Sequence, residues 1–161
     1  MARLSAGVLL YRDGPGGDVE VLIAHPGGPF WARKDNGAWS IPKGEYGVGD
    51  DPWEAARREF AEELGLPVPD GPRLELGAVK QAGGKVVTVF AVRADLDVTE
   101  ARSNTFELEW PRGSGRMQEF PEVDRVAWLP VEAARVKLLK DQHPFLDRLL
   151  AHPNAHPNAQ R

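Results

Sequence analysis

The segment 52–64 contains three closely spaced glutamates: Glu62 and Glu63 follow Glu59 by three and four positions. Residues at this spacing share one face of an α-helix, so their carboxylates form one acidic patch. Carboxylates this close repel one another unless a cation neutralises them. Oxygen ligands without cysteine or histidine suit a hard divalent ion such as Mg²⁺ or Mn²⁺. The alternative is a solvated acidic surface, which is the usual environment of glutamate.

The segment 52–64 has the start and stop signals of a helix. Asp51 is suited to the N-cap, Pro52 to the first helical position and Gly65 to the C-terminal stop. Apolar residues recur at helical spacing on the face opposite the carboxylates: Trp53, Ala56, Phe60 and Leu64. The pattern therefore predicts an amphipathic helix that presents the glutamates away from the core.

The segment 44–66 resembles the signature box of the Nudix hydrolases, Gly-x5-Glu-x7-Arg-Glu-U-x-Glu-Glu-x-Gly-U, where U is a bulky apolar residue. One specified position differs, because Asp50 replaces the glutamate, and we expect this change to affect loop support more than metal binding. The resemblance implies an α/β fold, an α/β/α sandwich with a mixed β-sheet, and metal-assisted attack of water on a diphosphate. The matching positions are Gly44, Arg58, Glu59, Phe60, Glu62, Glu63, Gly65 and Leu66.

The resemblance also implies roles for individual residues. We expect the Gly44 carbonyl, Glu59 and Glu63 to bind the metal, and Glu62 to share in ligation or act on water. Arg58 is expected to hold a carboxylate in place, as a guanidinium can through two parallel hydrogen bonds. These assignments make Glu62 and Arg58 candidate catalytic residues.

Glu122 is a further candidate, as an additional metal ligand or general base. It stands six residues before Trp128, and this spacing resembles that of a glutamate in diadenosine-polyphosphate hydrolases of the family. The alternative is an ordinary loop carboxylate, and Glu119 is the reserve candidate for the same role.

Two cationic positions are candidates for substrate binding. Lys43 directly precedes Gly44 and is either a solvated surface lysine or a point charge that faces phosphates. Arg33 and its neighbour Lys34 lie in a polar loop with two aromatic residues, which is a ligand loop or merely a surface loop. The sequence favours a nucleoside triphosphate or a dinucleoside polyphosphate as substrate and leaves the choice open.

Composition limits the other functional classes. The chain has 161 residues, a net charge of −4 and no cysteine. The acidic balance argues against a general nucleic-acid or membrane-surface binder, and the missing cysteines exclude thiolate chemistry. We expect a cytoplasmic enzyme whose N-terminal residues form a strand rather than a signal peptide. A homodimer is possible by family resemblance alone.

We expect a single domain over residues 1–151 and a disordered tail over 152–161, which repeats Ala-His-Pro-Asn. Strands are predicted at 3–12, 19–25, 39–44, 73–81, 85–93, 106–111 and 123–129, with a flexible loop at 112–119. Helices are predicted at 131–139 and 141–151, the latter with Phe145, Leu146, Leu149 and Leu150 facing the core.

Two functions remain after this reading. The first is hydrolysis of a pyrophosphate bond in a nucleoside diphosphate derivative. The second is a Nudix-fold module that binds or senses a nucleotide without turnover. Degenerate modules of that kind usually lose carboxylates of the box, whereas this chain retains Glu59, Glu62 and Glu63. The retained carboxylates favour the enzyme.

Overall fold

A mixed six-stranded β-sheet forms the centre of the computed structural model, which describes residues 3–155. Its order is β4-β5-β1-β2-β8, and β3 pairs with β1 beside this path. Only β1 and β5 pair in parallel, which makes the sheet mixed. The strands are β1 (Leu4–Asp13), β2 (Val19–Pro26), β3 (Lys43–Tyr46), β4 (Arg73–Lys80), β5 (Val86–Arg93) and β8 (Val123–Pro130).

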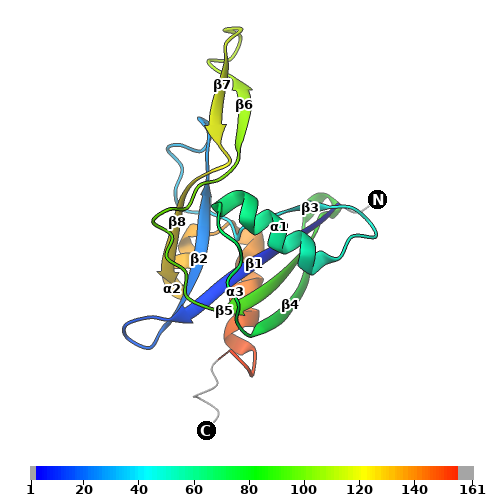
Figure 1. Cartoon of the computed structure of the whole chain (residues 1–161), viewed down its shortest axis with the longest axis vertical. Helices are drawn as coiled ribbons and strands as arrows, with labels where there is room; N and C mark the ends of the chain where they lie inside the picture. The colour runs from blue at the N-terminus through cyan, green and yellow to red at the C-terminus, as the bar shows by residue number, and fades with distance from the viewer. Residues whose placement is uncertain (1–2, 156–161) are drawn as a thin grey trace.

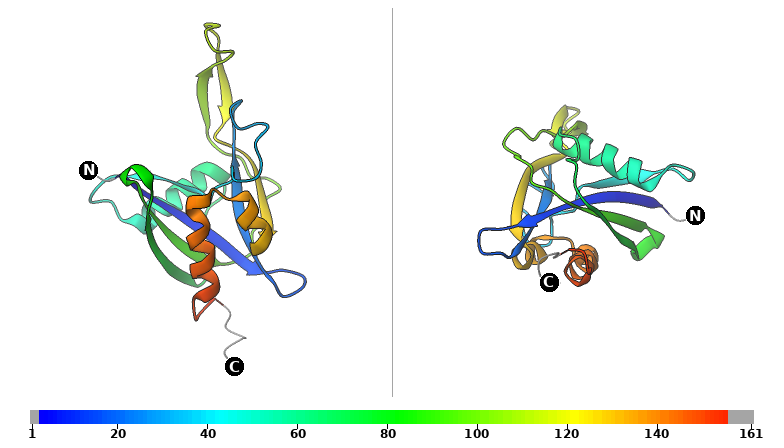
Figure 2. Two further views of the ribbon diagram at one scale, coloured as in Figure 1. Left: turned by 180° about the vertical axis from the view of Figure 1, so that it is seen from behind. Right: turned by 60° about the horizontal axis from the view of Figure 1, so that its bottom comes forward.

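Helices cover both faces of this sheet (Figures 1 and 2). Helix α1 (Pro52–Leu64) packs on one face, where Phe60 and Leu64 are fully buried against Val8 of β1. On the other face, α2 (Val131–Lys137) and α3 (His143–Ala151) cover a second apolar cluster. Short 3-10 turns precede β5 (Ala82–Gly84) and α3 (Lys140–Gln142). The expected α/β/α sandwich with a mixed sheet is therefore confirmed.

Helix α1 begins and ends where the sequence predicts. The Asp51 side chain accepts a hydrogen bond from the backbone N–H of Glu54, at 3.1 Å. Gly65 ends the helix in the left-handed conformation, with φ of 69°. A β-carbon at Gly65 would also meet the carbonyl oxygen of Arg102 at 2.3 Å, so glycine is required for two reasons. These two ends fix which turns of the helix carry the glutamates.

The strand expected over 39–44 is wrong in position. Trp39 and Ser40 form only isolated bridges, and the strand proper is Lys43–Tyr46. Between them the chain leaves β2 and crosses to β1, because Ser40 pairs with Ala24 whereas Gly44 pairs with Ala6. Pro42 has no N–H for a ladder, and the N–H of Ile41 donates to the Gln142 side chain instead.

A β-hairpin projects from the body of the molecule and is clear at the top of Figure 1. It joins β6 (Thr105–Glu109) to β7 (Met117–Pro121). The loop predicted at 112–119 is therefore too long, because its last three residues continue the ladder. The hairpin packs on the loop after β2, where the rings of Phe30 and Trp110 meet edge to face, with centroids 5.5 Å apart.

The C-terminal helix α3 differs from the expectation at one residue. Phe145, Leu146 and Leu149 are fully buried as predicted, but Leu150 is 43% exposed. Residues 152–155 form a turn in which Ala155 is buried, and its carbonyl accepts a hydrogen bond from Arg93 at 3.1 Å. The expected disordered tail over 152–161 stays a prediction, and residues 156–161 of it lie outside the described part. Within residues 3–155, no helix is long and apolar enough to cross a membrane.

Candidate active site

Gly44 of β3 lies directly against Glu59 of α1. A β-carbon built at Gly44 would come within 2.1 Å of the Glu59 carboxyl group, so a side chain at this position would have to displace the Glu59 carboxylate. Arg58 holds the same junction from the solvent side: its Nη2 lies 3.5 Å from both the Glu45 carbonyl oxygen and Glu59 Oε1. The carboxylate that Arg58 contacts is thus that of Glu59.

Glu63 is the most deeply placed carboxylate of the helix. Its pKa is raised to about 8, mainly by burial and also by the charges of Glu59 and Glu122. The ammonium group and backbone N–H of Lys43 oppose this rise. Burial and the charge of Glu62 also raise the pKa of Glu59, which Arg58 partly offsets. The carboxylates therefore sit where their own charge is unfavourable.

Glu122 lies close enough to act on this cluster. It stands at the bend between β7 and β8, and its charge contributes to the raised pKa of both Glu59 and Glu63. Its backbone is fixed by two hydrogen bonds: its N–H donates to the Asn104 carbonyl at 2.8 Å, and its carbonyl accepts from Gly27 at 2.9 Å. The proximity expected from the Glu122–Trp128 spacing is thus present.

Lys43 has a cationic neighbour that the sequence reasoning missed, Lys85, which directly precedes β5. The pKa of the Lys43 ammonium is lowered to about 8, mainly by burial and also by repulsion from Lys85. The sequence places Lys43 and Lys85 42 residues apart, and only the pairing of both β3 and β5 with β1 brings them together. Two cations next to an acidic cluster form an arrangement that suits a polyanion bridged to metal.

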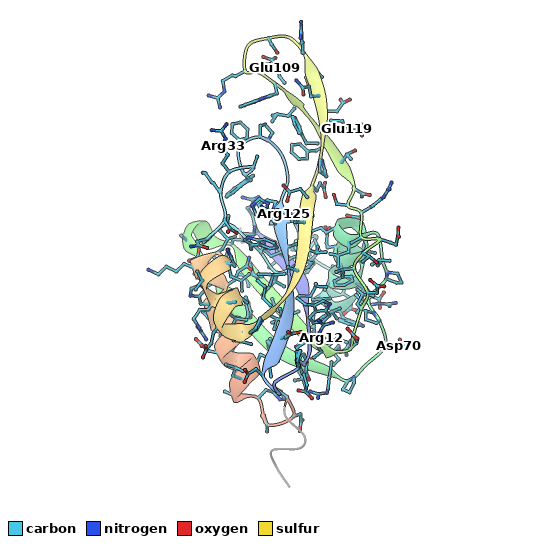
Figure 3. The ribbon with its side chains drawn as sticks, turned by 90° about the vertical axis from the view of Figure 1, so that its left-hand side faces the viewer. Arg12, Arg33, Asp70, Glu109, Glu119 and Arg125 are labelled. Atoms are coloured by element: carbon cyan, nitrogen blue, oxygen red, sulfur yellow. The ribbon has the colours of Figure 1, made fainter. Side chains whose placement is uncertain are left out.

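Arg33 is not part of this cluster. Figure 3 shows it on the loop after β2, on the opposite side of β8 from the teal helix α1. Glu119, the reserve candidate, lies in β7 of the hairpin, three residues before Glu122 (Figure 3). The role of Arg33 in substrate binding therefore stays a prediction that applies to a region away from the carboxylates.

Asp50, the departure from the signature, supports the loop between β3 and α1. Its Oδ2 accepts a hydrogen bond from the N–H of Gly47 at 3.1 Å. The loop ends at the next residue, Asp51, which caps α1. The contact agrees with the expectation that this side chain acts on the loop.

The donors present fit a hard divalent ion. The four carboxylates Glu59, Glu62, Glu63 and Glu122 supply only oxygen, and the absent β-carbon of Gly44 leaves room beside Glu59. Within residues 3–155, no three acidic or histidine side chains already stand at the spacing of a completed metal site. A metal would therefore have to draw these side chains together, against the repulsion that raises their pKa values.

Comparisons with known proteins agree with this geometry. The family profile for the NUDIX domain matches residues 1–152. The chain belongs to the NUDIX family. A relative, the 8-oxo-(d)GTP phosphatase of Mycolicibacterium smegmatis, is 30% identical, over 92% of this chain. The chain spans 42% of the length of that relative.

Solved structures share the fold at low sequence identity. The NUDIX domain of Shewanella oneidensis NrtR, complexed with ADP ribose, has a TM-score of 0.62 and 16% identity, over 92% of this chain and 86% of that chain. The Ap4A hydrolase of C. elegans has a TM-score of 0.59 and 19% identity, over 91% of this chain and 96% of that chain. At this sequence identity, the two structures show that the chain shares their fold.

Proposed function

We propose that this NUDIX protein hydrolyses a pyrophosphate bond in a nucleoside diphosphate derivative with the help of Mg²⁺ or Mn²⁺. The observation that carries the proposal is the contact between Gly44 and Glu59, beside the buried Glu63 and within the field of Glu122. A solvated acidic surface would require neither the missing side chain at position 44 nor a carboxylate with a pKa raised to about 8.

Each residue of the cluster has a role in this proposal. Glu59, Glu63 and the Gly44 carbonyl would hold the metal, with Glu62 as a further ligand or as the group that orients water. A divalent ion at this site supplies positive charge to the phosphate oxygens and makes water more acidic. Glu122 or Glu62 accepts a proton from the attacking water.

Basic residues complete the substrate site. Arg58 keeps Glu59 in position, and Lys43 presents its ammonium group to the phosphates. Lys85 extends the positive charge beside Lys43. Arg33, on the loop after β2, would contact only a part of the substrate that extends past β8 toward the hairpin (Figure 3).

The substrate we propose is a nucleoside triphosphate or a dinucleoside polyphosphate. The relative from M. smegmatis acts on 8-oxo-(d)GTP and the C. elegans neighbour on Ap4A, and both are consistent with a polyphosphate. The pair Lys43 and Lys85 favours a ligand with more than two phosphates, because each further phosphate adds negative charge for a second cation.

The test measures phosphate and pyrophosphate release by the full chain. The panel contains canonical and oxidised nucleoside triphosphates, ADP-ribose, NADH and dinucleoside polyphosphates, each with Mg²⁺ or Mn²⁺. Glu63→Gln is compared with Glu54→Gln, an exposed glutamate of the same helix. We expect Glu63→Gln to lower kcat by roughly 10²–10⁴ and Glu54→Gln to retain wild-type turnover.

Two outcomes would contradict the proposed function. Wild-type turnover by Glu63→Gln at saturating Mg²⁺ would show that hydrolysis does not require the proposed metal site. If the wild type releases neither phosphate nor pyrophosphate from any substrate of the panel but binds a nucleotide in calorimetry, the protein is a module that binds nucleotides without hydrolysis.

A further inference from the structure

The hairpin of β6 and β7 is joined to the candidate active site by hydrogen bonds at its base. The N–H of Asn104, just before β6, donates to the Glu62 carbonyl oxygen of α1 at 2.8 Å. The carbonyl oxygen of Asn104 in turn accepts the N–H of Glu122, just after β7, at 2.8 Å. The Ser103 hydroxyl also accepts the N–H of Val123 at 3.0 Å. The hairpin therefore extends in a fixed direction from the carboxylates.

The two faces of the hairpin differ in chemistry. Phe106 and Glu107 of β6 point to opposite sides of the ladder. Trp110 lies on the side of Phe106, and its N–H continues the ladder to the Arg116 carbonyl oxygen at 2.9 Å. On the other side, Glu107 stands directly opposite Glu119 of β7. One face is therefore aromatic and the other acidic, and only the aromatic face suits an anionic ligand.

The aromatic face packs on the loop after β2. A β-carbon at Gly28 would meet the Phe106 ring at 2.9 Å, so the glycine lets the hairpin approach the loop. Two residues further along, the Phe30 ring meets the Trp110 ring edge to face, with centroids 5.5 Å apart. Phe30 nevertheless stays 48% exposed, which leaves part of its surface open to a ligand. We call Phe30 and Trp110 the aromatic platform.

Basic side chains surround the aromatic platform. The Arg112 guanidinium lies 5.8 Å from the centre of the Phe30 ring, and the Lys34 ammonium lies 5.2 Å from the centre of the Trp31 ring. Within residues 3–155, neither of these cations forms an ion pair, and Arg33 of the same loop forms none either. Because the whole chain has a net charge of −4, this positive charge is a local feature that attracts an anion.

The aromatic platform stands well away from the carboxylates. Trp110 follows Thr105 by five positions, and Thr105 pairs with Pro121, the residue before Glu122. At the usual rise of a strand, Trp110 lies about 17 Å further along the hairpin than this pair. Figure 1 shows the hairpin extending away from the body of the molecule. A ligand whose reacting phosphates lie at the carboxylates therefore reaches the platform only with a group at the far end of a long phosphate chain.

We propose that the aromatic platform binds the second base of a dinucleoside polyphosphate. Arg33, Lys34 and Arg112 bind the phosphates next to that base. Stacking on an aromatic ring suits any base, and a cation beside the ring adds attraction. The inference rests on the proposed function, because it assigns a place to one end of that substrate. A nucleoside triphosphate has only one base and cannot occupy both ends of the site at once.

The first experiment compares two substitutions of Phe30 in the full chain. Phe30→Tyr keeps an aromatic ring, whereas Phe30→Leu keeps an apolar side chain that offers no ring face. We expect Phe30→Leu to lower the ratio of kcat/KM for Ap4A to kcat/KM for ATP by on the order of tenfold, and Phe30→Tyr to keep the wild-type ratio. Val136→Ala, at an exposed apolar residue of α2, is the control and should also keep the ratio. Equal ratios in Phe30→Leu and Phe30→Tyr would overturn the proposal.

The second experiment observes the aromatic platform without turnover. The full chain is labelled with 5-fluorotryptophan, and the ¹⁹F resonance of Trp110 is identified by its loss in Trp110→Phe. Without added metal, Ap4A should shift this resonance more than ATP does, and Phe30→Leu should reduce the shift. If Ap4A leaves the Trp110 resonance unmoved, or if ATP shifts it equally, the platform does not bind a second base.

The two proposals fail in different ways. If the wild type hydrolyses no substrate of the panel, the proposed function fails, and the Trp110 resonance still decides whether the platform binds the second base. If Ap4A is hydrolysed but every variant keeps the wild-type ratio and the Trp110 resonance stays unmoved, the hydrolase stands and the inference about the platform is overturned.

Discussion

Gly44 of β3 and Glu59 of α1 are in contact, and a side chain at position 44 would have to displace the Glu59 carboxylate. The nearest Glu59 atoms lie 2.1 Å from where a β-carbon of residue 44 would be. The position of the Glu59 carboxylate on α1 therefore depends on a strand residue that bears no side chain. The contact joins β3 to α1, the two elements between which the loop of the signature runs.

Gly44→Ala should impair metal binding with little effect on the fold. The added methyl group must displace Glu59, and we expect kcat/KM to fall by on the order of 10² because the ligand is misplaced. Calorimetric titration with Mg²⁺ and kinetics on the best substrate check this. Gly16→Ala is the matched control, since nothing lies within 4 Å of its β-carbon. Equal kinetics of the two variants would contradict the role of the Gly44 contact.

Stability of the metal-free protein should fall as the pH rises from about 5 to 8. Glu63 has a pKa near 8 when folded and an ordinary value of 4.5. Over this range the folded chain holds a proton that the unfolded chain has lost, so the slope of the unfolding free energy against pH is negative. The effect between pH 5 and pH 8 is on the order of 3 to 4 kcal/mol. Urea denaturation at several pH values measures it.

Glu63→Gln is the control for this prediction, because an amide has no proton to lose here. The excess of its unfolding free energy over that of the wild type should grow from pH 5 to pH 8. Saturating Mg²⁺ should make the wild type the more stable of the two, because the ion favours the carboxylate. Lys43 acts in the opposite sense above pH 8, because its lowered pKa makes the unfolded chain the one that holds the proton. A constant difference between the two proteins at all pH values would contradict the assignment to Glu63.

The sequence predicted the centre of the site because its parts are local. The glutamates lie on one helix that Asp51 and Gly65 cap, and its periodicity and caps can be recognised from residues close together in the sequence. The position of Glu122 was predicted through a spacing shared with relatives, and the structure brings it to the cluster.

The remainder depends on contacts between distant segments. Lys85 meets Lys43 only because β3 and β5 both pair with β1. The shift of β3 to Lys43–Tyr46 follows from a bridge of Ser40 to Ala24 and a hydrogen bond to Gln142, neither of which has a local signal. Residues 117–119 read as a loop because the partner strand β6 determines their conformation.

Asp50→Ala should weaken the loop before α1 without removing the metal site. The lost hydrogen bond to the Gly47 N–H contributes about 1 kcal/mol at most. We expect a rise in KM of roughly threefold and an unchanged Mg²⁺ affinity, because the side chain supports the loop only. Asp50→Glu, which restores the residue of the signature, should behave as the wild type. Loss of Mg²⁺ binding in Asp50→Ala would make this carboxylate a ligand.

Lys85→Gln should weaken substrate binding more than it slows turnover. Without the second cation, the site attracts the polyphosphate less, and we expect KM to rise by on the order of tenfold with kcat within about threefold of wild type. The rise should be larger for a triphosphate or a dinucleoside polyphosphate than for ADP-ribose, because the shorter ligand carries fewer charges. Steady-state kinetics at two salt concentrations measure this, and the wild type should depend on salt more steeply.

Lys80→Gln is the matched control, because Lys80 is an exposed lysine at the end of β4, on the same hairpin. It should leave KM unchanged. The same substitution at Lys85 should also raise the pKa of Lys43 toward its ordinary value, since the repulsion by Lys85 is removed. Reductive ¹³C-methylation followed by titration would detect that change. Equal KM values for the two variants would exclude Lys85 from the substrate site, whatever the substrate is.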